Sequence, residues 1–98
     1  MPEQPVTVYI SIGNRDDGLT QRRWAEFAWA MHSELEALGR LLGEWASCPV
    51  APWQNACWAI EFGSPERAAL ARAMVANIAR AYQQRAVAWA VAPETEML

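Results

Sequence analysis

The sequence predicts one α+β domain whose strands and helices follow in the order β-α-β-β-α-β. Residues 6–12 alternate apolar with mixed side chains, and residues 86–92 alternate alanine with larger apolar side chains. A period of two is typical of strands. Residues 21–38 and 65–82 repeat apolar side chains at helical spacing, and residues 41–47 and 53–62 flank a turn with two prolines. This order is that of the ferredoxin-like, or split βαβ, fold.

The first predicted strand has one apolar face and one mixed face. The apolar set is Val6, Val8, Ile10 and Ile12, and the mixed set is Thr7, Tyr9 and Ser11. We expect the helices to cover the apolar set, which leaves Tyr9 on the other side of the sheet.

Both predicted helices begin with a residue that is favoured as an N-cap. Thr20 is expected to cap the first helix, and Ser64 the second, where Pro65 takes the first helical position. Gly39 is expected to end the first helix. Helical spacing places Trp29 away from the core, beside His32. The residues predicted to be buried by the second helix are Leu70, Ala71, Met74, Ile78, Ala81 and Tyr82.

Right-handed crossovers would put both helices on one face of a four-stranded antiparallel sheet, with strand order 4-1-3-2. In the 53–62 strand, Trp58, Ile60 and Phe62 are expected to face the helices, with Cys57, Ala59 and Glu61 on the other side. For the last strand the pattern leaves two choices: either its alanines or Val87, Trp89 and Val91 meet the helices. The uncovered face must meet water, a ligand or another molecule, and Tyr9, Trp45 and Trp89 are expected there.

Length, charge and cysteine content limit the class of protein. The chain has 98 residues, which predicts a single domain over residues 1–98. Eight arginines against eleven acidic residues give a formal charge of −3, which argues against nucleic acid as a partner. No long apolar run or N-terminal leader is recognisable, so we expect a cytoplasmic protein and no membrane as a partner. Cys48 and Cys57 are expected to be buried thiols, with a cross-strand disulfide as the second possibility.

No catalytic residues, metal ligands or cofactor motif can be identified in the sequence. The single histidine, His32, is expected to be solvated, and Asp16 and Asp17 are interpreted as loop residues. No glycine-rich phosphate loop is present. The run Pro52–Trp58 leaves two interpretations: Gln54 and Asn55 bind a small ligand, or they shape the entry into a strand.

Three segments carry a resemblance to known proteins. Ser11–Gln21, Pro52–Trp58 and Ala88–Glu96 resemble segments of small uncharacterised proteins encoded by high-GC bacteria and their phages. The resemblance covers most of the chain and implies no activity, cofactor or site residue. In size, acidity and tryptophan content the chain also resembles immunity and inhibitor proteins.

These observations favour a non-enzymatic protein-binding module, such as an inhibitor, immunity or phage anti-defence protein that occludes its partner. Six tryptophans exceed the need of a small core, and tryptophan and tyrosine are enriched at binding hot spots. The expected contact residues are Tyr9, Trp29, Trp45 and Trp89, and we expect a homodimer through the open sheet face. The alternative is a cofactor-independent small enzyme or ligand-binding protein of the dimeric ferredoxin-like type. Its tryptophan-lined cavity would use Gln54, Asn55 or His32.

Overall fold

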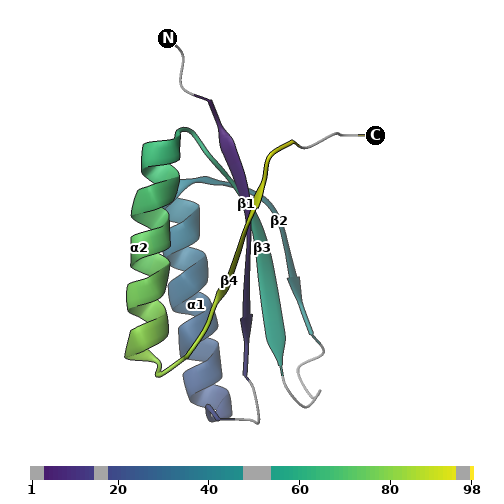
Figure 1. The fold of residues 1–98 in the computed structure, drawn as a ribbon. Coiled ribbons are helices and arrows are strands. Elements are labelled where there is room, and N and C mark those ends of the chain that lie inside the picture. Colours follow the sequence, from purple (N-terminus) through teal and green to yellow (C-terminus); the bar gives the residue numbers. More distant parts are fainter. Residues whose placement is uncertain (1–3, 15–17, 48–53, 95–97) are drawn as a thin grey trace.

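The computed structural model describes residues 4–14, 18–47, 54–94 and 98. Its elements, in chain order, are β1 (Val6–Gly13), α1 (Gln21–Leu38), β2 (Arg40–Ala46), β3 (Asn55–Phe62), α2 (Pro65–Ala81) and β4 (Ala88–Ala92). The four strands form one antiparallel sheet in the order β2-β3-β1-β4, which confirms the predicted strand order. Both helices lie on one face of this sheet (Figure 1). The chain therefore has the predicted ferredoxin-like α+β fold.

The core lies between the sheet and the two helices. Val8 and Ile10 of β1 are fully buried, as are Phe27 and Met31 of α1, and Trp58 of β3 is 3% exposed. These positions follow the period of two in the strands and the period of 3.6 in the helix. The two predicted N-caps are also confirmed, because the side chain of Thr20 accepts from Arg23 N and that of Ser64 from Arg67 N.

The buried face of α2 differs from the predicted one. Leu70 is 53% exposed and Ala81 is exposed, so both predictions are wrong. The buried residues of α2 are Ala68, Ala71, Val75 and Ala79. Their small side chains let α2 lie against α1, and the larger Leu70 is left on the outer side of the helix.

The last strand presents its larger side chains to the helices. Ile10 pairs with Trp89 and Val8 with Val91, and directly paired residues lie on the same face of a sheet. Trp89 is half-buried and stacks on Phe62, with ring centroids 6.0 Å apart. The prediction that Trp89 lies on the open face is therefore wrong, and the alanines of β4 lie there instead.

Gly39 ends α1, but not through a left-handed backbone. Its φ is −151°, which is extended. A Cβ at this position would lie 2.5 Å from Ile60 Cγ2 and 2.9 Å from Phe62 Cδ1. The close approach of the α1–β2 connection to β3 therefore requires glycine here.

Candidate functional site

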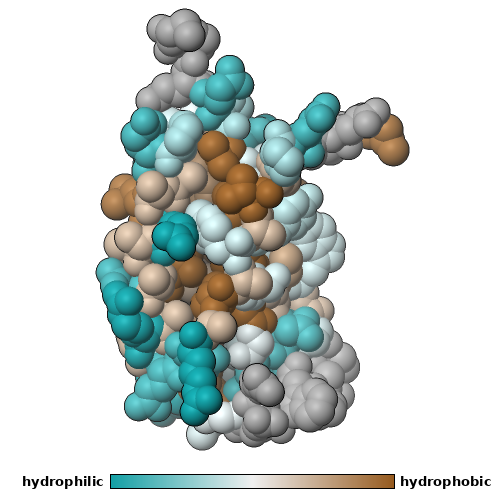
Figure 2. All heavy atoms as spheres, viewed as in Figure 1, coloured by the Kyte–Doolittle hydropathy of each residue, from teal (hydrophilic) through white to brown (hydrophobic). Residues whose placement is uncertain are grey.

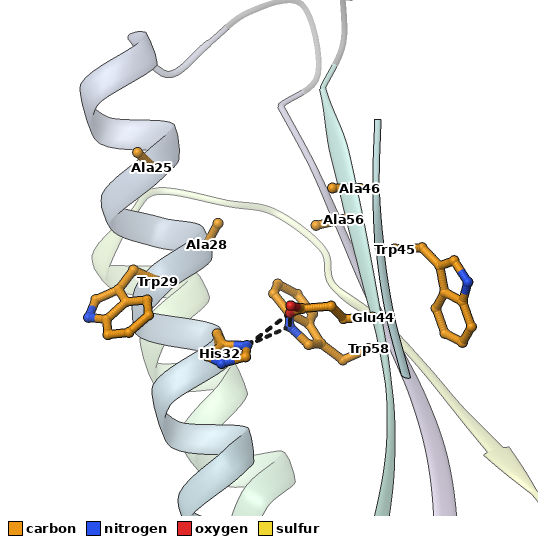
Figure 3. Close-up of a pocket in the computed structure, with 9 residues that line it drawn as sticks. All are labelled: Ala25, Ala28, Trp29, His32, Glu44, Trp45, Ala46, Ala56 and Trp58. Carbon is orange, nitrogen blue, oxygen red and sulfur yellow. Dashed lines mark hydrogen bonds and ion pairs between the residues drawn. The ribbon is translucent and has the colours of Figure 1, made fainter. Parts of the chain in front are cut away.

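A cleft of about 490 Å³ lies between α1 and the strands β2 and β3. Figure 3 shows side chains of α1 on one side of this cleft and those of the two strands on the other. Trp45 also borders the cleft, but its indole points away from it, on the opposite side of the sheet. The described residues that line the cleft are Ala25, Ala28, Trp29, His32, Glu44, Trp45, Ala46, Ala56 and Trp58.

Five side chains form what we call the acidic aromatic cluster: Trp29, His32, Glu36, Glu44 and Trp58. The three from α1 lie three and four residues apart, so they share one face of the helix. Glu44 and Trp58 are direct neighbours across the β2–β3 ladder. Because Trp58 faces the core, its neighbour Glu44 also faces α1. The fold thus brings together residues that are up to 29 positions apart.

The hydrogen bonds of the cluster converge on one oxygen of Glu44. The indole Nε1–H of Trp58 donates to Glu44 Oε2 at 2.9 Å, and His32 Nδ1 lies 3.0 Å from the same oxygen. On the other side of the ring, His32 Nε2 lies 2.7 Å from Glu36 Oε2. In its imidazolium form, His32 donates to both carboxylates. The imidazole ring is therefore held from both of its nitrogens.

Trp29 packs against the imidazole ring of His32. Its indole stacks on the imidazole of His32, with centroids 5.7 Å apart and an interplanar angle of 21°. Trp29 is nevertheless 69% exposed. The structure therefore agrees with the prediction that Trp29 points away from the core. It adds that the indole is supported on one face and open on the other.

The expectation of a solvated His32 is wrong, since only 20% of its side chain is exposed. The strand β2 lies across the face of α1 that helical spacing alone assigns to solvent. A sequence signal for this contact existed in Glu44. If Trp45 faces away from the helices, alternation turns Glu44 toward them, and a charged residue on that face needs a polar partner.

The cleft is acidic, and its buried polar atoms are hydrogen-bonded. Among the lining residues that the structure describes, none is lysine or arginine, and Glu44 is the one carboxylate. Within residues 4–14, 18–47, 54–94 and 98, no buried side-chain nitrogen or oxygen lacks a hydrogen bond. In the same ranges, no three His, Cys, Asp or Glu residues lie close enough together to hold a metal ion.

The open face, which is the sheet face opposite the helices, carries two of the predicted contact residues. Tyr9 is 39% exposed and Trp45 is 57% exposed. Trp45 pairs with Cys57, and its ring lies over Gly43, where an added Cβ would be 2.9 Å from Trp45 Cη2. Tyr9 and Trp45 therefore lie on the same face of the sheet, and Trp29 lies on the other side of the molecule, on α1.

Of the two cysteines and the two loop aspartates, only Cys57 lies within the described residues. Cys57 is half-buried on the open face, and not fully buried as expected. Its predicted partner Cys48 lies outside the described residues, so the disulfide alternative stays a prediction. Asp16, Asp17 and Trp53 also lie outside the described residues.

Gln54 and Asn55 have mainly structural contacts. Gln54 is 5% exposed, and its side-chain amide exchanges two hydrogen bonds with that of Gln21, at 3.0 and 2.9 Å. Its backbone oxygen accepts from Asn14 N at 2.7 Å. The backbone N–H of Asn55 donates to Ser47 Oγ at 2.9 Å, although its side chain is exposed. Both residues lie away from the acidic aromatic cluster, in contacts that order the entry into β3.

Comparison with known proteins gives one distant structural likeness. No family model and no curated protein matches the chain. A dimeric ferredoxin-like protein from an uncultured marine organism is similar in structure, with 11% sequence identity and a TM-score of 0.48. The match covers 98% of this chain and 94% of that one. In the part of the chain that the structure describes, no helix has the length and apolar character needed to cross a membrane.

Proposed function

We propose that this chain is a protein-binding module that covers a basic surface of its partner with the acidic aromatic cluster. In this proposal an arginine of the partner enters the cleft between α1 and β2. Its guanidinium stacks on the open face of Trp29, and the carboxylates of Glu36 and Glu44, which hold His32 on the other face of that indole, attract it through their charge. The partner is thereby occluded, as expected for an inhibitor, immunity or anti-defence protein.

The observation that carries the proposal is the support beneath an exposed tryptophan. Trp29 is 69% exposed, yet its indole stacks on His32, which two carboxylates hold in place. A large aromatic side chain that is fixed before binding loses little conformational freedom on binding. Rigid exposed tryptophans of this kind are typical of binding hot spots.

The chemistry of the cluster favours a planar cation. Guanidinium groups stack on indole faces and form paired hydrogen bonds with carboxylates, which an ammonium group does less well. Among the described residues, Glu44 Oε1 has no hydrogen-bond partner, because both contacts of that carboxylate use Oε2. Glu36 and Glu44 are also half-exposed or more, at 60% and 52% of their side chains. Their charge can therefore attract an arriving cation without disruption of the core.

The edge strand β2 favours contact through side chains over the addition of a strand. Its pairing with β3 has an irregularity between Leu41 and Gly43. Bulges and charged residues on an edge strand oppose pairing with a further strand. The strand β2 has both features, namely the irregularity and the charged residues Arg40 and Glu44.

Titration with short peptides tests the proposal. A glycine-serine peptide with one central arginine is compared with the same peptide carrying neutral citrulline. We expect binding of the arginine peptide only, with an affinity that falls as salt rises. Trp29→Ala is expected to weaken it by about three- to thirtyfold, the range of cation–π contacts.

A matched pair of carboxylate variants controls for net charge. Glu36→Gln and Glu34→Gln remove the same charge from the same helix, but only Glu36 belongs to the cluster. We expect Glu36→Gln to weaken binding and Glu34→Gln to leave it within experimental error. Equal losses, or equal binding of the citrulline peptide, would contradict the proposal.

The cleft also favours a second candidate function, the binding of a small planar ligand. Its volume of about 490 Å³ lies within the range of small-molecule sites. A neutral aromatic ligand could stack on Trp29 without using the carboxylates. Binding of neutral indole derivatives that Glu36→Gln leaves unchanged would favour this candidate over the first.

We also propose that a second copy of the chain covers the open face. This face lies on the other side of the sheet from the acidic aromatic cluster, so one protomer can use both surfaces at once. The proposal is supported by Tyr9 and Trp45, two exposed aromatic side chains on the same face of the sheet.

A further inference from the structure

The central row of the open face alternates between large and small side chains. Tyr9 pairs with Ala59 on one side and with Ala90 on the other, and Ala59 pairs with Gly43. The ring of Trp45 fills the place above Gly43. Across the sheet, from β2 to β4, the row therefore runs large, small, large, small. Of the two small residues, Ala90 is exposed, whereas Ala59 is 3% exposed and lies covered between Trp45 and Tyr9.

We propose that two copies pack these faces together about a two-fold axis that runs parallel to the strands, between β3 and β1. This inference rests on the proposed self-association and adds its symmetry and its contacts. Such an axis places β2 of one copy against β4 of the other, and β3 against β1. Trp45 then meets Ala90 of the second copy, which is exposed, whereas Tyr9 lies over β3 of the second copy, where Ala59 is already covered at 3% exposure.

The alternative axis, perpendicular to the strands in the plane of the interface, is disfavoured by the same row. It would place each strand against its own copy, so that Trp45 meets Trp45 and Tyr9 meets Tyr9. Packing sheets interdigitate their side chains across a gap of about 10 Å, which requires large residues to face small ones. The axis parallel to the strands satisfies this condition at both contacts between Trp45 and Ala90, because Ala90 is exposed.

The rows on either side of the central row also fit this arrangement. One holds Cys57 and Ser11, which would face each other across the axis. In the other, Glu61 pairs with Thr7 and forms an ion pair with Arg40 at 3.4 Å. The two-fold places Glu61 of one copy against Thr7 of the next, so like charges do not meet. Apart from this ion pair, the described residues of the open-face rows are uncharged, which suits an identical surface better than a basic partner.

The size of the face indicates a weak dimer. Four strands at a spacing of about 4.8 Å and five paired rows at about 3.4 Å per residue span about 330 Å² of sheet. Standard stable interfaces bury about 800 Å² per partner. We therefore expect a dimer that forms and dissociates with concentration.

The edge of β4 offers a second copy another place to bind. Figure 2 shows hydrophobic residues gathered between α2 and β4, and Val91 of β4 is 55% exposed on this side. No charged residue interrupts β4, so its free edge lacks the protection found in β2. Pairing of β4 with β4 of a second copy is therefore the competing arrangement that an experiment must separate.

Thiol cross-linking separates the two arrangements. In a Cys48→Ser variant, Cys57 is the remaining thiol. Face-to-face packing places the two Cys57 Cα atoms about 11 Å apart, whereas edge pairing through β4 places them about 24 Å apart. We expect a short bismaleimide to give a covalent dimer at a yield that rises with protein concentration. No cross-linked dimer at concentrations where sedimentation shows dimers would overturn the face-to-face arrangement.

Two lysine variants on β4 provide the matched control. Ala90 lies on the open face and Val91 on the helix side, and both are exposed. Ala90→Lys is expected to raise the dimer dissociation constant by about tenfold or more, and Val91→Lys to leave it unchanged. The reverse pattern, or a wild-type chain that stays monomeric up to millimolar concentration, would overturn the proposal. Trp29→Ala should leave dimerisation unchanged, so failure of the arginine proposal and failure of the dimer are distinguishable.

Discussion

The carboxylate of Glu44 accepts the indole N–H of Trp58 at 2.9 Å, directly across the β2–β3 ladder. This hydrogen bond joins the core to the proposed binding surface, because Trp58 is 3% exposed and Glu44 also contacts His32. A residue of the proposed interface thus also satisfies a polar atom of the core. Changes at Glu44 should therefore affect both stability and binding.

Glu44→Ala is expected to lower the free energy of unfolding by about 1 kcal/mol, since the Trp58 N–H loses its main acceptor. Glu44→Gln retains an amide oxygen in the same place and should cost less than half as much. Urea denaturation of both variants measures the difference. Equal losses would show that the charge of Glu44, and not its acceptor oxygen, stabilises the fold.

Trp29→Ala should separate stability from binding. Because Trp29 is 69% exposed, its removal is expected to change the free energy of unfolding by no more than about 0.5 kcal/mol. The same variant should lose affinity for the arginine peptide. A large loss of stability would mean that Trp29 mainly supports the fold.

Asn14 should be among the most sensitive polar residues. It is 1% exposed, its Nδ2 donates to Leu19 O at 3.0 Å, and its Oδ1 accepts from Leu19 N at 2.8 Å. Asn14→Ala leaves two backbone groups of Leu19 without these partners, so we expect a loss of about 2–3 kcal/mol. The exposed N-cap hydroxyl of Thr20, which accepts one hydrogen bond from Arg23 N, provides the comparison, and Thr20→Ala should cost about 1 kcal/mol. Thermal unfolding followed by circular dichroism measures both.

Gly39→Ala should destabilise the chain although Gly39 has an ordinary extended backbone. The new methyl group would lie 2.5 Å from Ile60 Cγ2, 2.9 Å from Phe62 Cδ1 and 3.0 Å from the backbone oxygen of Glu61. Overpacking of this kind typically costs about 1–3 kcal/mol. Gly63→Ala is the control, since a Cβ there meets nothing within 4 Å. A similar loss in both variants would show that backbone freedom, and not packing, requires glycine at position 39.

The sequence was sufficient to predict the order of the elements, the strand order and both N-caps, because each depends on local periodicity or on general rules of chain connection. The face of β4 was not predictable, since alanines alternate with Val87, Trp89 and Val91 and both sets are apolar. Pairing with β1 decides it by placing Trp89 opposite Ile10. In α2, helical spacing fitted two neighbouring stripes, and contact with α1 selected the one with smaller residues.

The candidate site was only partly predictable for a different reason. The outward positions of Trp29 and Tyr9 followed from the pattern of single elements, whereas the pattern left the face of Trp45 open. The contact between His32 and Glu44 joins a helix to a strand that follows it, and depends on how closely β2 lies along α1. Local periodicity contains no information on that distance, so the cluster could be found only once the elements were placed in space.

The most direct test of the central claim is an NMR titration that follows the indole N–H signals of the tryptophans. An arginine peptide is added to uniformly ¹⁵N-labelled protein, and the signals are assigned with single Trp→Phe variants. We expect the Nε1–H signals of Trp29 and Trp58 to shift together along one saturation curve, while that of Trp45, on the opposite side of the sheet, stays in place. A shift confined to Trp45, or no shift that distinguishes arginine from citrulline, would contradict the assignment of the acidic aromatic cluster as the binding site.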